Sequence, residues 1–490
     1  MPKAVEVKYS RFDGGISDSP RDNQGNVFQF AKNFNIYKDK QKLAPVRGWI
    51  GDETFGTPTG IRAYNLKAIS YGGMGRINAI GTKADGTGSK YFSKIDPLST
   101  SWTEEKDFNT TPAPLESTYQ AVPGFVIFKD NYLWHILYQS GFYYIARIDY
   151  NIPPVVYTPN YKLLNVTANG SPIPSAVVFG DNKIYVSDVN NLYAISSNGT
   201  IAANALTLPS NYVITSMANY NHYIAIAAYT TNPTTTSAIF LWDGSAPTFN
   251  FSINLGEGTV KVIENINGTL ISVIDKYISG TLGNLQASMI IKALNQFGQT
   301  AETLKEVYVQ TGSISQYKAV KGGSLLFYAS LDGNSGIWSF GRKDSNSQYA
   351  LTLLTETPGT SFNGFYRIGE FLYTAHSGNG SISRTNNNPV YDQSSVWQSQ
   401  IIGEAERQHQ AIGAVITFEP LTSGQSVTLE YRKDGGAWTA VATQNTVGSL
   451  SFPSLNFNCI FREIELRVTS QGASITGVKF RYSELTDSIS

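Results

Sequence analysis

The sequence is poor in cysteine and in charged residues. Cys459 is the only cysteine among 490 residues, so neither a disulfide framework nor a cysteine-based metal site is available. In the strand-like stretch LNFNCIFREI this thiol is expected to serve as a small core hydrophobe. Charged residues make up 15% of the chain, well below the roughly 25% of an ordinary soluble domain. This shortage, with abundant Gly, Tyr, Asn, Ser and Thr, favours strands and turns over helices.

Neither sign of charge is in excess. Lys and Arg total 37, Asp and Glu also total 37, and the formal net charge is therefore zero. The composition gives no electrostatic support for a nucleic-acid or anionic-membrane partner. A near-neutral surface resists association only weakly, which suits a subunit of an assembly.

Long hydrophobic runs are absent from the sequence. No stretch of about 18 uncharged apolar residues occurs, and the opening MPKAVEVKYSRFDGG lacks the apolar segment of a signal peptide. We therefore expect a protein that is made in the cytosol and spans no membrane.

Motifs that carry chemistry are scarce as well. The four histidines are His135, His222, His376 and His409, and no HExxH, GxSxG or GxxxxGK[ST] sequence occurs. The first three occupy comparable places in repeated phrases and could converge on a central channel, although half-buried strand or turn positions are the simpler interpretation. Asp- and Asn-rich turns such as DGNSG at Asp332 could hold calcium, but turn chemistry explains them without a metal. We predict no catalytic, cofactor-binding or metal-binding residues, and a protein that is not an enzyme.

One phrase returns between about Ile61 and Thr385: a short apolar strand, a polar turn, and a second strand with alternating aromatics, as in AVVFGDNKIYVSDVNNLYAIS. Its starts are separated by roughly 40 to 65 residues, the span of a four-stranded propeller blade with variable loops. An all-β protein is therefore predicted, with a β-propeller of about six to eight blades; stacked sandwiches are the alternative. Residue pairs that tolerate positive φ mark the hairpins: Asp181-Asn182, Asn221-His222, Asn267-Gly268 and Gly322-Gly323.

The pattern changes at both ends of the chain. From about Val396 longer alternating strands such as ITGVKFRYSEL predict a β-sandwich, with Asp434-Gly435-Gly436 as its best hairpin turn. The opening residues are rich in turns but carry more aromatics than a disordered tail would. We predict an extended N-terminal arm at 1–50, a β-propeller at 51–395 and a C-terminal β-sandwich at 396–490.

The opening segment contains a moderately specific phrase in which GGI, a polar gap, an aromatic residue, AxN, a short strand and LxPxxG follow one another. It resembles the start of the nozzle and tail-hub proteins of short-tailed bacteriophages, in which such a phrase precedes a β-propeller. The remainder of the chain matches these proteins only in its architecture. The residues that carry the resemblance are Gly14, Gly15, Ile16, Phe28, Ala31, Asn33, Leu43, Pro45 and Gly48.

The resemblance implies a structural component of the virion tail, assembled in the cytoplasm of the bacterial host. Such proteins form rings, commonly hexameric, that line or close the DNA exit channel. The partners would be copies of the chain, other tail, adaptor or fibre proteins, and genomic DNA that passes without sequence-specific binding. On this hypothesis, deletion of residues 1–50 leaves a folded but assembly-defective protein. The arm residues expected to lock neighbouring subunits are Phe12, Ile16, Phe28, Phe30 and Phe34.

Two other functions stay open. The chain could be a receptor- or glycan-binding tail protein of the fibre or baseplate-attachment kind, because its abundant aromatics suit sugar stacking as well as protein interfaces. It could also be a propeller hydrolase that draws two acids from separate blades, but with 37 acidic residues that pairing cannot be read from the sequence.

Overall fold

The structure is a computed structural model, and it contains strands, turns and bends but no helix among the residues that it describes. No membrane-crossing helix is accordingly found among those residues. The all-β class is confirmed. The described residues are 4–12, 14–16, 27–39, 41–51, 54–55, 61–71, 74–83, 89–107, 120–151, 156–167, 172–230, 234–279, 285–294, 300–309, 311–342, 347–357, 362–376, 381–385, 394–452 and 459–485.

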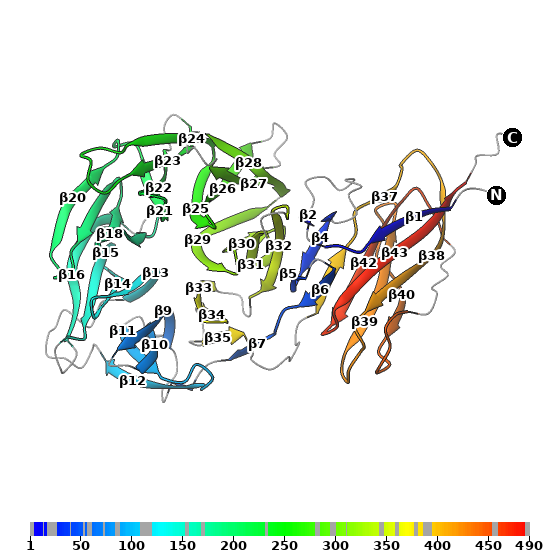
Figure 1. Ribbon diagram of the computed structural model, residues 1–490, viewed down its shortest axis with the longest axis horizontal. Coiled ribbons are helices and arrows are strands. Elements are labelled where there is room, and N and C mark those ends of the chain that lie inside the picture. Colours follow the sequence, from blue (N-terminus) through cyan, green and yellow to red (C-terminus); the bar gives the residue numbers. More distant parts are fainter. Residues whose placement is uncertain are drawn as a thin grey trace.

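Seven blade-like sheets follow one another around a ring, which confirms the predicted β-propeller (Figure 1). In each blade the first strand lies nearest the axis and later strands lie progressively further out. In blade 1 the short β8 (Thr54–Phe55) adds a parallel strand outside β12. Blades 1 to 3 are β9 (Ile61–Tyr71), β10 (Met74–Lys83), β11 (Ser89–Lys94) and β12 (Ser101–Asp107); β13 (Gln120–Lys129), β14 (Tyr132–Gln139), β15 (Phe142–Asp149) and β16 (Val156–Thr167); and β17 (Ala176–Val178), β18 (Ile184–Asp188), β19 (Asn191–Ile195) and β20 (Ile201–Thr207).

The ring closes between its first and last blades. The outermost strand of blade 7 is β7 (Trp49–Gly51), which comes from the N-terminal segment and pairs antiparallel with β35. Strand β9 of blade 1 lies beside the first two strands of blade 7. Blades 4 to 7 are β21 (Val213–Tyr220), β22 (Tyr223–Thr230), β23 (Thr236–Trp242) and β24 (Phe251–Glu257); β25 (Thr259–Ile266), β26 (Thr269–Ser279), β27 (Leu285–Leu294) and β28 (Ala301–Val309); β29 (Gly312–Lys321), β30 (Ser324–Leu331), β31 (Asn334–Gly341) and β32 (Ala350–Glu356); and β33 (Phe362–Ile368), β34 (Phe371–His376), β35 (Ser381–Thr385) and β7.

The hairpins between the first and second strands of the blades have the predicted chemistry. Asn182, Asn221 and Asn267 have φ values of 64°, 52° and 51° at the turns of blades 3, 4 and 5. Such left-handed backbone is the conformation that Asn and Gly tolerate best. The Asp434-Gly435 turn between β39 (Ser426–Lys433) and β40 (Thr439–Gln444) has the same character, with φ values of 51° and 70°.

Burial along a blade changes from its middle to its rim. In β22 the run Ile224–Ala228 is buried on both sides, because neighbouring blades cover both faces of the middle strands. The rim strand β24 alternates instead, with Ile253 and Leu255 buried between exposed residues. In the sequence, a blade therefore appears as continuous apolar runs for its middle strands, followed by an alternating run for its rim strand.

The C-terminal part is the predicted β-sandwich, whose two sheets share one core, with Ile416 and Phe480 from one sheet and Leu429 and Val468 from the other. The first and the last described strands of the chain lie side by side in this sandwich (Figure 1). One sheet contains β41 (Ile460–Phe461), β38 (His409–Phe418), β43 (Ile475–Glu484), β1 (Ala4–Tyr9), β6 (Lys42–Pro45) and β5 (Phe34–Asp39); the other contains β4 (Phe30–Lys32), β36 (Ser395–Gln398), β37 (Ile402–Gly403), β42 (Glu463–Gln471), β39 (Ser426–Lys433) and β40 (Thr439–Gln444).

The N-terminal segment is shared between the two bodies and does not form a separate arm. Strand β1 pairs along β43 of the sandwich, whereas β7 completes blade 7 of the propeller. Between them, β2 (Gly15–Ile16) and β3 (Val27–Phe28) form a short parallel pair near blade 6. Deletion of residues 1–50 would remove strands from both bodies, so the prediction of a folded deletion variant does not survive.

Propeller and sandwich are joined by one continuous sheet. Strand β4 pairs parallel with β32, the outermost strand of blade 6, through Lys32 and Leu353. On its other side β4 pairs antiparallel with β36 of the sandwich. The buried side chains of blades 5 and 6 and of the sandwich form a single core.

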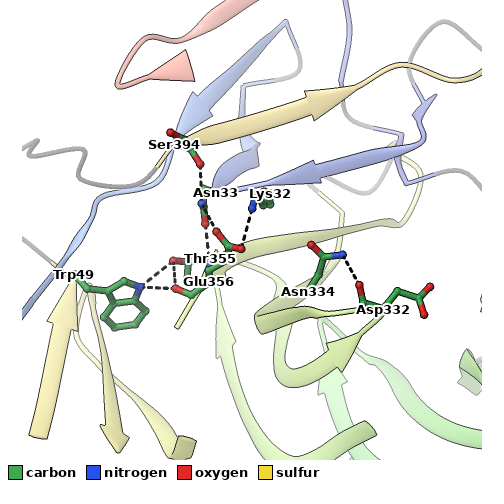
Figure 2. A network of polar contacts seen from close by, with 8 residues as sticks. All are labelled: Lys32, Asn33, Trp49, Asp332, Asn334, Thr355, Glu356 and Ser394. Carbon is green, nitrogen blue, oxygen red and sulfur yellow. Dashed lines mark hydrogen bonds and ion pairs between the residues drawn. The ribbon is translucent and has the colours of Figure 1, made fainter. Parts of the chain in front are cut away.

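Asn33 is the polar centre of this junction (Figure 2). Its φ is 60° and its side chain is buried. The side-chain Nδ2 donates to Glu356 Oε2 at 3.2 Å and to the Ser394 carbonyl at 2.9 Å, and Oδ1 accepts the Glu356 amide at 3.0 Å. Lys32 pairs with the same carboxylate at 2.9 Å. The Trp49 indole donates to the Glu356 carbonyl at 2.8 Å, just where β7 begins.

Asn33→Ala should destabilise the protein by about 3 to 5 kcal/mol, because it removes three partly buried hydrogen bonds and places Ala in left-handed backbone. The measurement is urea unfolding followed by tryptophan fluorescence. Asn221→Ala is the control, since it has a similar φ but lies exposed in a hairpin, and it should cost about 1 kcal/mol. Equal losses in the two variants would show that the side-chain contacts of Asn33 contribute nothing.

Candidate functional site in the central channel

A cavity of about 660 Å³ lies on the propeller axis. Its wall comes from the innermost strands β13, β17, β21, β29 and β33 and the residues that flank them, so five blades contribute. The wall carries hydroxyl, amide and cationic groups beside aromatic rings. The residues that the argument below uses are Gly124, Ser175, Ser216, Gln316, Lys318 and Arg367.

Two wide bulges shape this wall. In β29 the register passes from Ile314 opposite Ala329 to Lys318 opposite Phe327, so residues 315–317 face one partner residue. In β13 a similar shift leaves residues 122–125 opposite Ile136. Bulges redirect side chains and are frequent beside functional sites. Gly124 lies within the second bulge, where a Cβ atom would approach Ile136 to 2.6 Å, and this close approach accounts for glycine there.

Gln316 extends from the β29 bulge to two other blades. Its Oε1 accepts the amide of Ile173, which precedes β17, at 2.9 Å. Its Nε2 donates to the Thr215 carbonyl of β21 at 2.7 Å. A single side chain therefore joins blades 3, 4 and 6 across the channel.

Lys318 makes a second set of contacts across the axis. Its ammonium donates to the Met217 carbonyl at 2.7 Å and to the Ile263 carbonyl at 2.6 Å. The Glu264 carboxylate lies 3.0 Å away, and both side chains of this ion pair are largely buried. Lys318 therefore connects blade 6 to blades 4 and 5, and the neighbouring Glu264 carboxylate neutralises its charge.

Other side chains also form hydrogen bonds to the backbone of a neighbouring blade. Ser175 Oγ accepts the Met217 amide at 3.2 Å, and Ser216 Oγ accepts the Ile263 amide at 3.2 Å. Arg367 donates to the Val320 carbonyl at 2.8 Å. The innermost strand of a blade has an unpaired edge toward the axis, and buried backbone groups need partners. These side chains supply them.

The chemistry of the channel is that of polar recognition between fixed groups. The polar side chains of the wall donate to or accept from backbone groups of other blades, so these contacts hold the ring together at its axis. Among the described residues, no group of three or more His, Cys, Asp or Glu side chains is placed to hold a metal ion.

The histidines do not converge on this channel. His135 lies in β14, the second strand of blade 2, and His222 is exposed in the β21–β22 turn. His376 ends β34, also a second strand, and His409 begins β38 in the sandwich. Their similar places in the repeated phrases reflect similar places in the blades, away from the innermost strands.

The five aromatic and aliphatic residues expected at a subunit interface lie in the junction between the two bodies of the same chain. Four of them are at most 7% exposed within this chain, and Phe30 is half-buried. Phe12, for example, meets the ring of Trp397 edge-on at a centroid distance of 6.1 Å. The buried side chains leave almost no surface for a neighbouring subunit. They are Phe12, Ile16, Phe28 and Phe34.

No protein-family model matches the chain, and no curated protein matches it. Solved structures do resemble it at low sequence identity. Exo-β-1,3-galactanase from Phanerochaete chrysosporium, with galactose, is 13% identical, with a TM-score of 0.33 over 89% of this chain and 100% of that one. The Pan2 WD40 domain of Neurospora crassa is 13% identical, with a TM-score of 0.40 over 71% and 97%. U3-55K is 10% identical, with a TM-score of 0.44 over 69% and 97%.

These similarities concern the fold, and they correct one prediction. The sequence predicted a protein that is not an enzyme. The solved structures that resemble the chain include a glycoside hydrolase, exo-β-1,3-galactanase, so this prediction no longer stands. The likeness assigns no reaction to this chain.

Lys318→Met should destabilise the propeller by about 2 to 4 kcal/mol, because it leaves the Glu264 carboxylate and two carbonyls without their donor. Chemical denaturation measures the loss. Lys183→Met is the matched control: Lys183 pairs with Asp181 at 2.7 Å in an exposed turn and should cost less than about 1 kcal/mol. A loss for Lys318→Met no larger than the control would contradict a structural role for the channel contacts.

His135 predicts a dependence of stability on pH. Burial lowers its pKa from 6.5 to about 3, and contact with the Leu133 backbone raises it by less. Neither ring nitrogen has a hydrogen-bond partner among the described residues. Between these pH values His135 therefore binds a proton in the unfolded chain but not in the folded chain. Stability should fall as the pH is lowered from about 6.5 toward 3, by at most roughly 1.4 kcal/mol per pH unit from this group.

His135→Phe should flatten that part of the pH dependence, because the replacement ring carries no titrating nitrogen. Urea midpoints at pH 7.5 and 4.5 measure the difference. The matched variant His222→Phe makes the same replacement at an exposed turn position and controls for the added phenylalanine ring. If His135→Phe lost as much stability on acidification as the unmodified chain, another group would have to be responsible.

Proposed function

We propose that the chain is a structural subunit of a bacteriophage tail, which assembles with copies of itself around the DNA exit channel as nozzle or hub proteins do. The observation that carries this proposal is the place of the residues that resemble the start of such proteins. They lie in the joint between propeller and sandwich. A rigid joint between two bodies suits a subunit that must hold its shape in a force-bearing ring.

Three residues of the resembling phrase show what the joint demands. Gly15 has φ 71°, and a Cβ atom there would lie 2.7 Å from the Leu351 amide nitrogen of blade 6. Ala31 is fully buried, and its carbonyl accepts from Thr352 Oγ1 at 3.2 Å. Asn33 supplies the bonds described above. Each residue type is explained by the close approach of the N-terminal segment to blade 6.

The proposed DNA path runs between subunits. Gln316 and Lys318 cross the axis of the single propeller and bind backbone groups of three other blades. A duplex whose major groove alone is about 12 Å wide does not fit such an axis. In this proposal, several chains together surround the DNA exit channel, which is distinct from the central channel of each propeller.

Contacts between subunits need surface that the chain leaves exposed. Strand β38 presents two apolar side chains outward, Ile412 and Val415, with 43% and 38% of their surface exposed. Neighbouring residues of the same strand point into the sandwich core. Burial of such side chains stabilises an interface at about 25 cal/mol per Å² before the cost of association is subtracted. We take this sandwich face as the assembly surface.

The test is mass photometry and negative-stain electron microscopy of the full-length chain over a range of concentrations. The proposal expects rings, or a discrete multimer of the 53.6 kDa subunit. The double variant Ile412→Ser/Val415→Ser should raise the concentration needed for assembly at least tenfold while its melting temperature stays close to that of the unmodified chain.

The matched control is Ile95→Ser/Leu98→Ser, which removes a more exposed apolar pair from the β11–β12 connection of blade 1, where the two residues are 60% and 47% exposed. It should assemble normally. A strict monomer at every concentration would contradict the ring proposal, and equal effects of the two double variants would contradict the choice of surface.

A further inference from the structure

A second cavity, of about 1020 Å³, lies outside the ring where the propeller meets the sandwich. The end of β28 in blade 5 and the β30–β31 turn of blade 6 form one side. Strands β4, β36 and β39 form the other. The lining residues that carry the argument are Gln29, Tyr308, Asp332, Asn334, Gln398 and Arg432.

Tyr308 is the aromatic platform of this cleft. It lies near the end of the rim strand β28 and is 61% exposed, whereas its neighbour Val309 is buried. An exposed ring at the wall of a polar cleft offers an apolar face and a hydroxyl to a ligand. Phe30 adds a half-buried aromatic side chain to the opposite wall.

The polar groups of the cleft are held in defined positions. Asp332 Oδ1 accepts the Thr311 amide at 3.0 Å, and the Asp332 amide donates to the Thr311 carbonyl at 2.8 Å. Asn334 Nδ2 donates to the Asp332 main-chain carbonyl at 3.4 Å, and the Asp332 carboxylate points away from Asn334 (Figure 2). On the facing wall, Gln398 Nε2 donates to Gln29 Oε1 at 3.1 Å. Preorganised groups of this kind lower the cost of binding.

The charges in the cleft are balanced. Arg432 donates through Nε to Glu465, whose side chain is buried, and its guanidinium lies 5.0 Å from the centre of the Trp438 ring. Among the lining residues that the structure describes, Asp332 is the only acidic one and Arg432 the only basic one. A cleft with one charge of each sign and several amides favours a neutral ligand with many hydroxyl groups.

We propose that this cleft binds a neutral oligosaccharide, with a sugar ring stacked on Tyr308 and its hydroxyls bonded to Asn334, Gln398 and Gln29. A sugar ring has an apolar face and a polar rim, which the aromatic side chain and the amides of the cleft complement. The site lies apart from the assembly surface on β38 and from the central channel. It therefore goes beyond the proposed function, and it can be tested whether or not rings form.

The experiment uses the full-length chain on an array of neutral and acidic oligosaccharides, followed by calorimetry with the best neutral hexasaccharide of the array. Tyr308→Ala should weaken binding at least tenfold, and Asn334→Ala should weaken it at least threefold. Tyr308→Phe keeps the ring and should stay within threefold of the unmodified chain. The matched control Phe251→Ala removes a ring that is 53% exposed on β24, the corresponding rim strand of blade 4, and should change nothing.

Melting temperatures of all variants establish that each is folded, which separates loss of the site from loss of the fold. Retention of neutral saccharides together with selective loss in Tyr308→Ala would support the proposal. Absence of binding to any neutral saccharide, binding to acidic saccharides alone, or equal affinity in Tyr308→Ala and the unmodified chain would each overturn it. None of these outcomes depends on the mass-photometry result.

Discussion

The hydrogen bonds of Asn33 to Glu356 and Ser394 are the constraint on which the two-body arrangement depends. They tie the outermost strand of blade 6 to the segment that enters the sandwich, and Trp49 extends the same network to the strand that closes the ring. A buried polar group is stabilising only when its partners are all in place. Loss of these hydrogen bonds would therefore destabilise both the closure of the ring and the joint between propeller and sandwich.

A propeller also has to solve a problem at its axis, where every innermost strand exposes an unpaired edge. Here Gln316 and Lys318 bind backbone groups of other blades, and Ser175 and Ser216 do so between neighbours. The three-residue bulge of β29 brings the first two side chains into reach. The axis is consequently a joint as well as a cavity, which is why we place the proposed DNA path between chains.

The cleft beside the joint exists because the two bodies are held at a fixed distance. Tyr308 and Asp332 belong to the propeller, whereas Gln398 and Arg432 belong to the sandwich. Their common cleft therefore depends on the continuous sheet through β4. The proposed tail subunit and the proposed saccharide site thus draw on the same rigid geometry, although each stands on its own residues.

The sequence by itself determined the features that are local. Turn pairs such as Asn267-Gly268 need positive φ, and apolar runs return at the spacing of blades, so the all-β class, the propeller and the sandwich could be predicted. Only the tertiary structure decided which distant strands pair: β7 with β35, β1 with β43, and β4 with both bodies. Phe12 and Phe34 were therefore assigned to a subunit interface although they are buried in the chain's own core, because a hydrophobic side chain carries no sign of the partner that covers it. The sequence did not reveal Gln316 or Tyr308 as site residues for a related reason. Gln316 is placed by the bulge of β29, and Tyr308 by its position on a rim strand where propeller and sandwich meet. Neither circumstance leaves a pattern in the neighbouring residues.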